Sequence, residues 1–232
     1  MASRKSRIIL IETSASLCSV ALAEEGRVVA YRESAVGRDH AALTAPFVKE
    51  VLDEAGLKVA DCSAVAVSAG PGSYTGLRVG SSTAKGLCFG AGIPLISIAT
   101  PDIIVAKVLA GGLAPAGCTA IVPMIDARRM EVYSAVYSPA GERLSEIAPV
   151  VVDSDSFADL EGTVLFAGDG ALKCCEVLGR PGFVFEEVVA DAASMAPLAF
   201  RKLEERDFAD TAYFEPFYLK DFVATVSRKK LW

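Results

Sequence analysis

The stretch SAGPGSYTGLRVG, residues 68–80, decides the fold of this chain. The apolar residues 64–67 before it predict a buried strand, and its glycines predict a turn that opens a helix near Thr75. Glycines let a backbone approach a ligand closely, and a helix N-terminus presents unpaired N–H groups. The lysine of the GxxxxGK[ST] phosphate loop is absent, and so is GxGxxG. Two interpretations stay open, an anion cradle and a strand-to-helix turn without a ligand.

The composition indicates a compact protein that does not bind nucleic acid on its own. With 232 residues and 52% hydrophobic content, the chain can bury the core of one large domain or two small ones. Its formal charge of −6 argues against autonomous binding of phosphate backbones. Six cysteines without CxxC spacing indicate reduced thiols.

The N-terminus does not predict a secretory signal or a membrane anchor. Basic residues precede an apolar run, but Glu12 ends that run after four residues, which is too short for a signal peptide. No stretch approaches the length that spans a bilayer. We therefore expect a cytoplasmic protein without membrane contact.

Turn signals and hydrophobic periodicity predict two tandem β-β-β-α-β-α units. In the first unit we expect strands over 8–11, 17–23, 27–33, 64–68 and 95–98, and helices over 40–55 and 75–91, with another helix starting at Thr100. In the second we expect strands over 120–125, 131–137, 143–152 and 164–166, and helices over 171–178 and 194–205. Such a duplication favours an α/β, ribonuclease-H-like fold of two lobes with a cleft, as in actin, the Hsp70 ATPase and sugar kinases (ASKHA).

Three ordered motifs carry a resemblance to a known family. They are IILIETS at 8–14 with CSVAL at 18–22, the glycine loop at 68–80, and DARRMEVY at 126–133. PFYL at 216–219 adds a weaker match near the end. Together these motifs resemble the TsaB (YeaZ) family, which implies the same duplicated fold. We expect an N-terminal lobe over 1–100, a C-terminal lobe over 101–215 and a tail over 216–232.

The superfamily resemblance implies a nucleotide site in the cleft, with a carboxylate on the first strand holding Mg²⁺ through water. Glu12 takes that place, where the family more often has Asp. ATP or ADP with Mg²⁺ is thus expected at the cleft or at a partner interface. The residues expected to surround the nucleotide are Glu12, Thr13, Ser14, Gly70, Gly72, Ser73, Thr75 and Asp126.

A catalytic metal site is not expected. The catalytic paralogue TsaD carries an HxxxH pair, and the matching positions here are Thr100 and Ile104. Isoleucine cannot ligate a metal, and the chain has one histidine. That histidine, His40, begins a predicted helix, where a capping or surface role is favoured over catalysis. We assign no catalytic residue and no metal ligand.

The resemblance implies a non-catalytic scaffold that docks and orders TsaD, working with the ATPase TsaE, in transferring threonylcarbamoyl to N6 of adenosine 37 of ANN-decoding tRNAs. Transfer RNA would be contacted only through this complex. The alternative is an independent nucleotide-binding ATPase or small kinase.

The predicted helices 40–55 and 75–91 are the expected partner face, which in the family also forms a homodimer, although part of it must face the protein's own core. Its expected residues are His40, Leu43, Phe47, Arg78, Ala84, Leu87 and Cys88.

Overall fold

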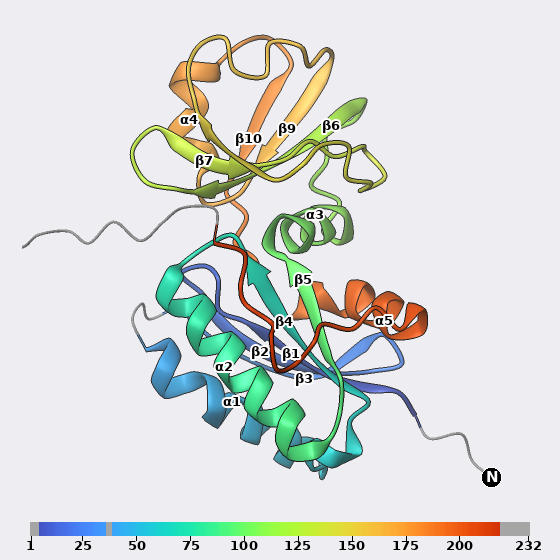
Figure 1. Ribbon diagram of the computed structural model, residues 1–232. Coiled ribbons are helices and arrows are strands. Elements are labelled where there is room, and N and C mark those ends of the chain that lie inside the picture. Colours follow the sequence, from blue (N-terminus) through green and yellow to red (C-terminus); the bar gives the residue numbers. More distant parts are fainter. Residues whose placement is uncertain (1–4, 36–38, 219–232) are drawn as a thin grey trace, which may run out of the picture.

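Two five-stranded sheets form the framework of the protein (Figure 1). The computed structural model describes residues 5–35 and 39–218. The first sheet has the order β3-β2-β1-β4-β5, and the second has the order β10-β9-β6-β7-β8. The strands of the first sheet are β1 Arg7–Glu12, β2 Cys18–Glu24, β3 Arg27–Ser34, β4 Ala64–Gly70 and β5 Leu95–Ala99. Those of the second are β6 Cys118–Asp126, β7 Glu131–Ser134, β8 Ala148–Val151, β9 Thr163–Ala167 and β10 Phe183–Glu186.

The two sheets share one topology. In each, the first three strands pair antiparallel as a meander, and the fourth and fifth strands add in parallel on the other side of the first. Parallel neighbours need a crossover, which helix α2 Tyr74–Ala91 supplies in the first sheet and helix α4 Ala171–Leu178 in the second. The repeated strand order confirms the predicted duplicated α/β fold.

Helices cover the outer faces of both sheets. Helix α1 His40–Ala55 and α2 pack on one face of the first sheet (Figure 1), where their apolar sides bury residues such as Val51, Ala84 and Val67. Gly56 and Gly92 end these helices in the left-handed conformation that glycine adopts without strain. On the second sheet, α4 buries Cys174 and Leu178 against Phe166.

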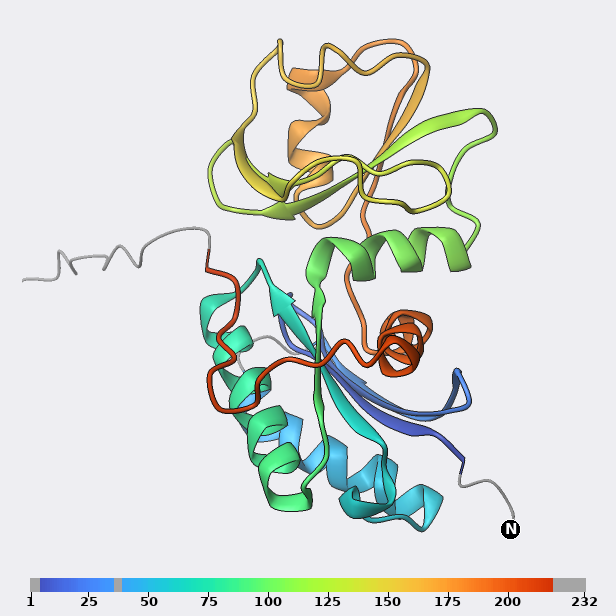
Figure 2. The same ribbon diagram turned by 45° about the vertical axis from the view of Figure 1, so that its right-hand side comes forward.

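One core joins the two sheets across the inner faces. Helix α3 Thr100–Ala110 lies between them in both views (Figures 1 and 2), and its side chains Ile103 and Val108 are fully buried. The cluster continues into Ile8 and Ile96 of the first sheet and into Leu165 of the second. The lobes are therefore held together by shared apolar burial, not only by the chain that connects them.

The last helix returns to the first lobe. Helix α5 Ala196–Glu205 falls within the range 101–215 that we expect for the C-terminal lobe, yet it packs against β1 and β5. The chain then continues along β5, where the Ala209 N–H donates to the Leu95 carbonyl at 2.9 Å. Most of the expected tail, 216–232, lies outside the described residues.

The second lobe departs from the prediction in its meander. The strand expected over 143–152 is formed only at Ala148–Val151, and the one expected over 131–137 ends at Ser134. Tyr137 instead makes isolated bridges to Ile121 and Arg143. Turns over 154–159 take the place of a helix between the third and fourth strands. The helix expected over 194–205 is a short 3-10 turn, Ala193–Met195, followed by α5.

Among the described residues, no helix is both long enough and apolar enough to cross a membrane. All six cysteines are free thiols, and four of them are buried. Burial raises the pKa of the Cys88 thiol to about 11.

Candidate functional site

The glycine loop and the end of β1 form one hydrogen-bonded unit. The Ser73 N–H donates to the Ser14 carbonyl at 2.7 Å, and the Thr13 hydroxyl donates to the Gly76 carbonyl at 2.8 Å. Ser73 is the N-cap of α2, and its Oγ accepts from the Gly76 N–H at 3.3 Å. The helix therefore begins at Tyr74, one residue before the predicted start at Thr75, which is exposed.

Three glycines of this loop are required by close packing. A Cβ at Gly72 would lie 2.4 Å from the Ser14 carbonyl oxygen, and one at Gly76 would lie 2.0 Å from that of Thr13. At Gly80 it would meet the Thr13 hydroxyl at 2.3 Å. The spacing of four residues places all three glycines where α2 crosses the end of β1. Of the two interpretations of the loop, this geometry supports the turn that packs without a ligand.

Gly70, at the end of β4, requires glycine for a different reason. It has a positive φ of 92° and precedes Pro71 through a cis peptide bond. A Cβ there would lie 3.1 Å from the Phe217 carbonyl oxygen, so the chain end 209–218 packs directly on this turn.

Glu12 is fully buried at the end of β1. Its Oε1 accepts from the Ser14 N–H at 2.5 Å, and its Oε2 has no hydrogen-bond partner within the described part of the chain. Burial raises the pKa of this carboxyl to about 7, an effect that hydrogen bonds from Ser14 and Ser68 reduce. Thr13 and Ser14 are buried as well.

Asp126, the carboxylate expected from the second lobe, is already neutralised. Lys173 of α4 forms an ion pair with it, and the same ammonium donates to the Glu131 carbonyl at 2.7 Å. Its Oδ1 also accepts from the Arg128 N–H at 2.8 Å, and its own N–H donates to Asp169 at 2.9 Å. Burial raises the pKa of Asp169. These contacts satisfy Asp126 within the second lobe.

The cleft between Ser14, Thr100 and Asp169 holds a cavity of only about 10 Å³. The hydroxyls of Ser14 and Thr100 are buried there, that of Thr100 without a partner among the described residues, and Ile104 lines the same cavity. No group of three potential metal ligands occurs in the described ranges 5–35 and 39–218. As arranged, these residues do not fit a magnesium nucleotide, because the space suits a single water molecule and the second carboxylate is paired.

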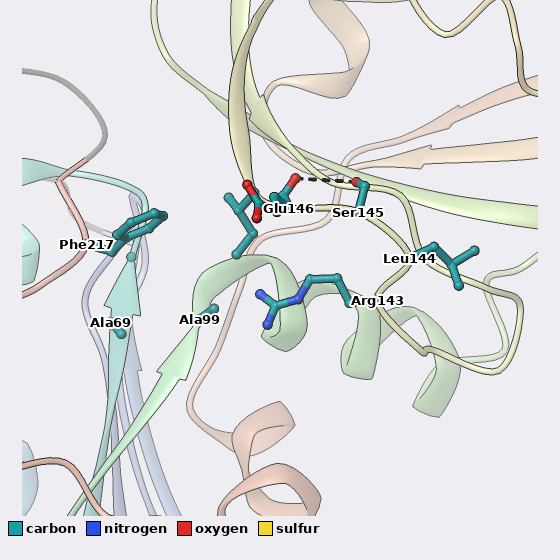
Figure 3. A pocket seen from close by; sticks show the side chains of 9 residues that line it. Ala69, Ala99, Arg143, Leu144, Ser145, Glu146 and Phe217 are labelled. Atoms are coloured by element: carbon teal, nitrogen blue, oxygen red, sulfur yellow. Dashed lines mark hydrogen bonds between the residues drawn. The ribbon is translucent and has the colours of Figure 1, made fainter.

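A larger pocket opens beside this cleft, and of the residues expected to surround a nucleotide only Gly70 lines it. It has a volume of about 540 Å³ and lies between the lobes (Figure 3). The first lobe contributes Ala69, Gly70 and Ala99, the β7–β8 connection contributes residues 143–147, and Phe217 closes one side. Residues 143–147 carry no motif and lie in a predicted strand, so no sequence signal identifies this wall of the pocket.

The expected partner face divides into buried and accessible residues. Ala84 and Cys88 are 0% and 2% exposed, because they pack on the first sheet, which corrects their assignment to a partner surface. Leu43, Phe47 and Leu87 are half-buried, and Arg78 is exposed with its guanidinium 5.5 Å from the Tyr74 ring centre. The His40 ring bonds the Ala15 carbonyl at 3.1 Å and so ties α1 to the turn after β1.

One exposed aromatic on α2 was missed. Phe89 is 89% exposed, and the neighbouring Gly86 and Gly90 leave open space around the helix. Because aromatic side chains contribute strongly at protein interfaces, Phe89 is a candidate contact residue for another protein. The sequence could have indicated this exposure, because Phe89 directly follows Cys88, which packs on the first sheet, and therefore lies on another side of the helix.

Comparison with known proteins gives consistent matches. A family model described as "TsaD: tRNA N6-adenosine threonylcarbamoyltransferase" matches residues 33–164. The chain is similar to "tRNA threonylcarbamoyladenosine biosynthesis protein TsaB" of Escherichia coli (strain K12), with 32% identity covering 94% of this chain and 96% of the relative. The protein of the same name from Bacillus subtilis (strain 168) is 30% identical over 92% of this chain and 93% of its own. The solved structure "YeaZ from Pseudomonas aeruginosa" superimposes with a TM-score of 0.81 at 26% identity, covering 92% of this chain and 100% of that one.

Proposed function

The chain belongs to the TsaB family and thus to tRNA threonylcarbamoyladenosine biosynthesis, and we propose that it acts there as a non-catalytic scaffold that docks and orders the catalytic subunit TsaD. The observation that carries this proposal is the state of the cleft. Thr100 and Ile104, which the family resemblance matches to the paralogue's metal-binding histidines, are 1% and 2% exposed. Asp126 is paired with Lys173. Thr100, Ile104 and Asp126 thus offer neither a pair of metal-binding histidines nor an unpaired carboxylate.

The docking surface that we propose lies on the accessible side of α1 and α2. Phe89 and Arg78 are exposed there, and Leu43, Phe47 and Leu87 are partly accessible at its base. Aromatic and arginine side chains contribute most to protein interfaces. The same surface would pair two copies of this chain when TsaD is absent.

The remaining assignments follow from this role. TsaE would supply ATP hydrolysis, and tRNA would be held by the complex because the chain alone carries a net charge of −6. ATP or ADP with Mg²⁺ is proposed at the partner interface instead of the cleft, where the residues do not fit it. The complex would work in the cytoplasm, where tRNA is modified.

A reconstituted assay tests the proposal. Unmodified tRNA is incubated with TsaD, TsaE, the threonylcarbamoyl-AMP donor and ATP, with and without this chain, and threonylcarbamoyladenosine is measured. We expect modification only when the chain is present, and no ATP hydrolysis by the chain alone. Modification that is indifferent to the chain would overturn the scaffold role, and ATP turnover by the chain alone would support the alternative of an independent ATPase or kinase.

A further inference from the structure

The pocket of about 540 Å³ between the lobes has the size of a small-molecule site. Its floor is built from the ends of β4 and β5, and its far wall is the connection 143–147 of the second lobe. Both lobes therefore contribute to it, as in sites that form where two domains meet. It is distinct from the narrow cleft at Ser14 and Thr100.

Two opposite charges line this pocket, and the guanidinium of Arg143 also interacts with the hydroxyl of Tyr137, which donates to Asp102 at 2.6 Å. Arg143 and Glu146 are both exposed, and neither forms an ion pair with any residue that the structure describes. Figure 3 shows the Arg143 guanidinium pointing toward Ala99, the N-cap of α3, which has no side-chain cap of its own. A guanidinium at this place is suited to a carboxylate, which it can bind with two parallel hydrogen bonds.

An aromatic ring faces these charges across the pocket (Figure 3). Phe217 is 47% exposed, and its backbone is fixed because its N–H donates to the Ala69 carbonyl at 2.7 Å. Lys85 holds the preceding chain through the carbonyls of Ala212 and Phe214, each at 3.0 Å. The ring is thus an anchored apolar surface against which a planar group can stack.

We propose that this pocket binds a carboxylate-bearing ligand of nucleoside size, with the carboxylate on Arg143, a planar ring on Phe217 and hydroxyl or N–H donors on Glu146. Among such ligands, threonylcarbamoyladenosine has all three groups: a threonyl carboxylate, a purine, and hydroxyl and carbamoyl N–H donors. This choice of ligand rests on the proposed function, whereas the ligand class rests on the pocket itself.

Calorimetric titration of the full chain tests the proposal with three probes: the free nucleoside threonylcarbamoyladenosine, adenosine and threonine. We expect the modified nucleoside to bind at least about tenfold more tightly than either fragment, because a hydrogen bond to a charged group contributes a factor of about 10 to 100. Arg143→Gln should remove that advantage, and Arg143→Lys should retain part of it. Arg201→Gln, an exposed arginine on α5, is the matched control and should change nothing.

Three results would overturn the inference: no binding of the modified nucleoside, equal binding of adenosine or threonine, or an unchanged affinity in Arg143→Gln. Glu146→Gln provides a second variant if Arg143→Gln lowers the melting temperature, and should weaken binding of the modified nucleoside. The reconstituted modification assay is a separate readout. Loss of binding with an intact requirement for the chain would refute the pocket and leave the scaffold role standing.

Discussion

At the scale of single residues, Glu12 links stability to pH. Its pKa is raised from 4.5 to about 7 by burial, so the native state holds a proton that the unfolded state has already released between these values. Because the native state binds more protons, the free energy of unfolding falls as pH rises through this interval. Across the full shift the loss amounts to about 3 kcal/mol.

Glu12→Gln should remove this dependence. The amide oxygen can accept from the Ser14 N–H as the protonated acid does, and it carries no charge at any pH. The measurement is urea unfolding at pH 5 and pH 8. The free energy of unfolding of the wild type should be lower at pH 8, whereas that of the variant should be nearly the same at both pH values. Glu24→Gln is the control, because Lys5 and Arg7 lower the pKa of that partly buried carboxyl, so its variant should keep the slope due to Glu12. If the stability of Glu12→Gln depended on pH as strongly as that of the wild type, the raised pKa of Glu12 would be refuted.

At the scale of the element, α2 offers a matched pair of glycines. Alanine at Gly76 would place its Cβ 2.0 Å from the Thr13 carbonyl oxygen, a backbone atom that cannot move without distorting β1. We expect Gly76→Ala to cost about 3 kcal/mol or more. At Gly86 nothing lies within 4 Å, so Gly86→Ala should stabilise by up to about 1 kcal/mol through helix propensity. Chemical unfolding measures both, and similar effects of the two substitutions would contradict the packing role of the loop.

The same helix shows what the sequence could and could not predict. Apolar residues 64–67 and the glycine turn predict the strand and the helix after it, and both are found within one or two residues. The role of the glycines could not be predicted from the sequence. A bound ligand and a closely packed backbone both require residues without a side chain, so either one explains the glycines. That role depends on the carbonyls of Thr13 and Ser14, which lie about sixty residues earlier in the chain.

The predicted strand over 143–152 failed for a related reason. Residues 142–146 are exposed and leave the sheet, so the strand forms only at Ala148–Val151. Alternation of apolar and polar residues indicates a strand without saying whether a neighbour is present to pair with it. The pocket at Arg143 and Glu146 exists because the chain departs from the sheet there.

Phe89 provides the test of the proposed docking surface on α2. The side chain is 89% exposed, so Phe89→Ala should leave the melting temperature of the isolated chain unchanged. A buried aromatic at an interface centre contributes about 2 kcal/mol or more, so the affinity for TsaD should fall by at least tenfold. Leu172→Ala on α4, where Leu172 is 51% exposed, is the control and should bind as the wild type. Unaltered affinity in Phe89→Ala would exclude this face of α2.

At the scale of the whole molecule, the sequence predicts the duplication of the fold. It does not predict the contacts that join the two lobes. The repeated pattern of strands predicts two similar sheets, and the matching strand orders confirm them. That α3 is buried between both sheets, and that α5 returns to β1 and β5, depends on contacts between segments far apart in the chain. Lys107 of α3 adds a polar link, since it pairs with Asp191 at 2.6 Å.

Because one core joins both sheets, we expect the described lobes to unfold together. Ile103 on α3 is fully buried within the cluster that reaches Ile8 and Leu165, so Ile103→Ala should cost about 2 to 5 kcal/mol. Hydrogen exchange in mild denaturant should then show β1 and β6 losing protection at the same denaturant concentration, lower than in the wild type. Phe89→Ala removes no core contact, so β1 and β6 should lose protection at the same denaturant concentration as in the wild type. Loss of β6 protection while β1 remains protected would mean that the lobes are independent units, and a scaffold with a hinge at α3 would replace one whose lobes share a core.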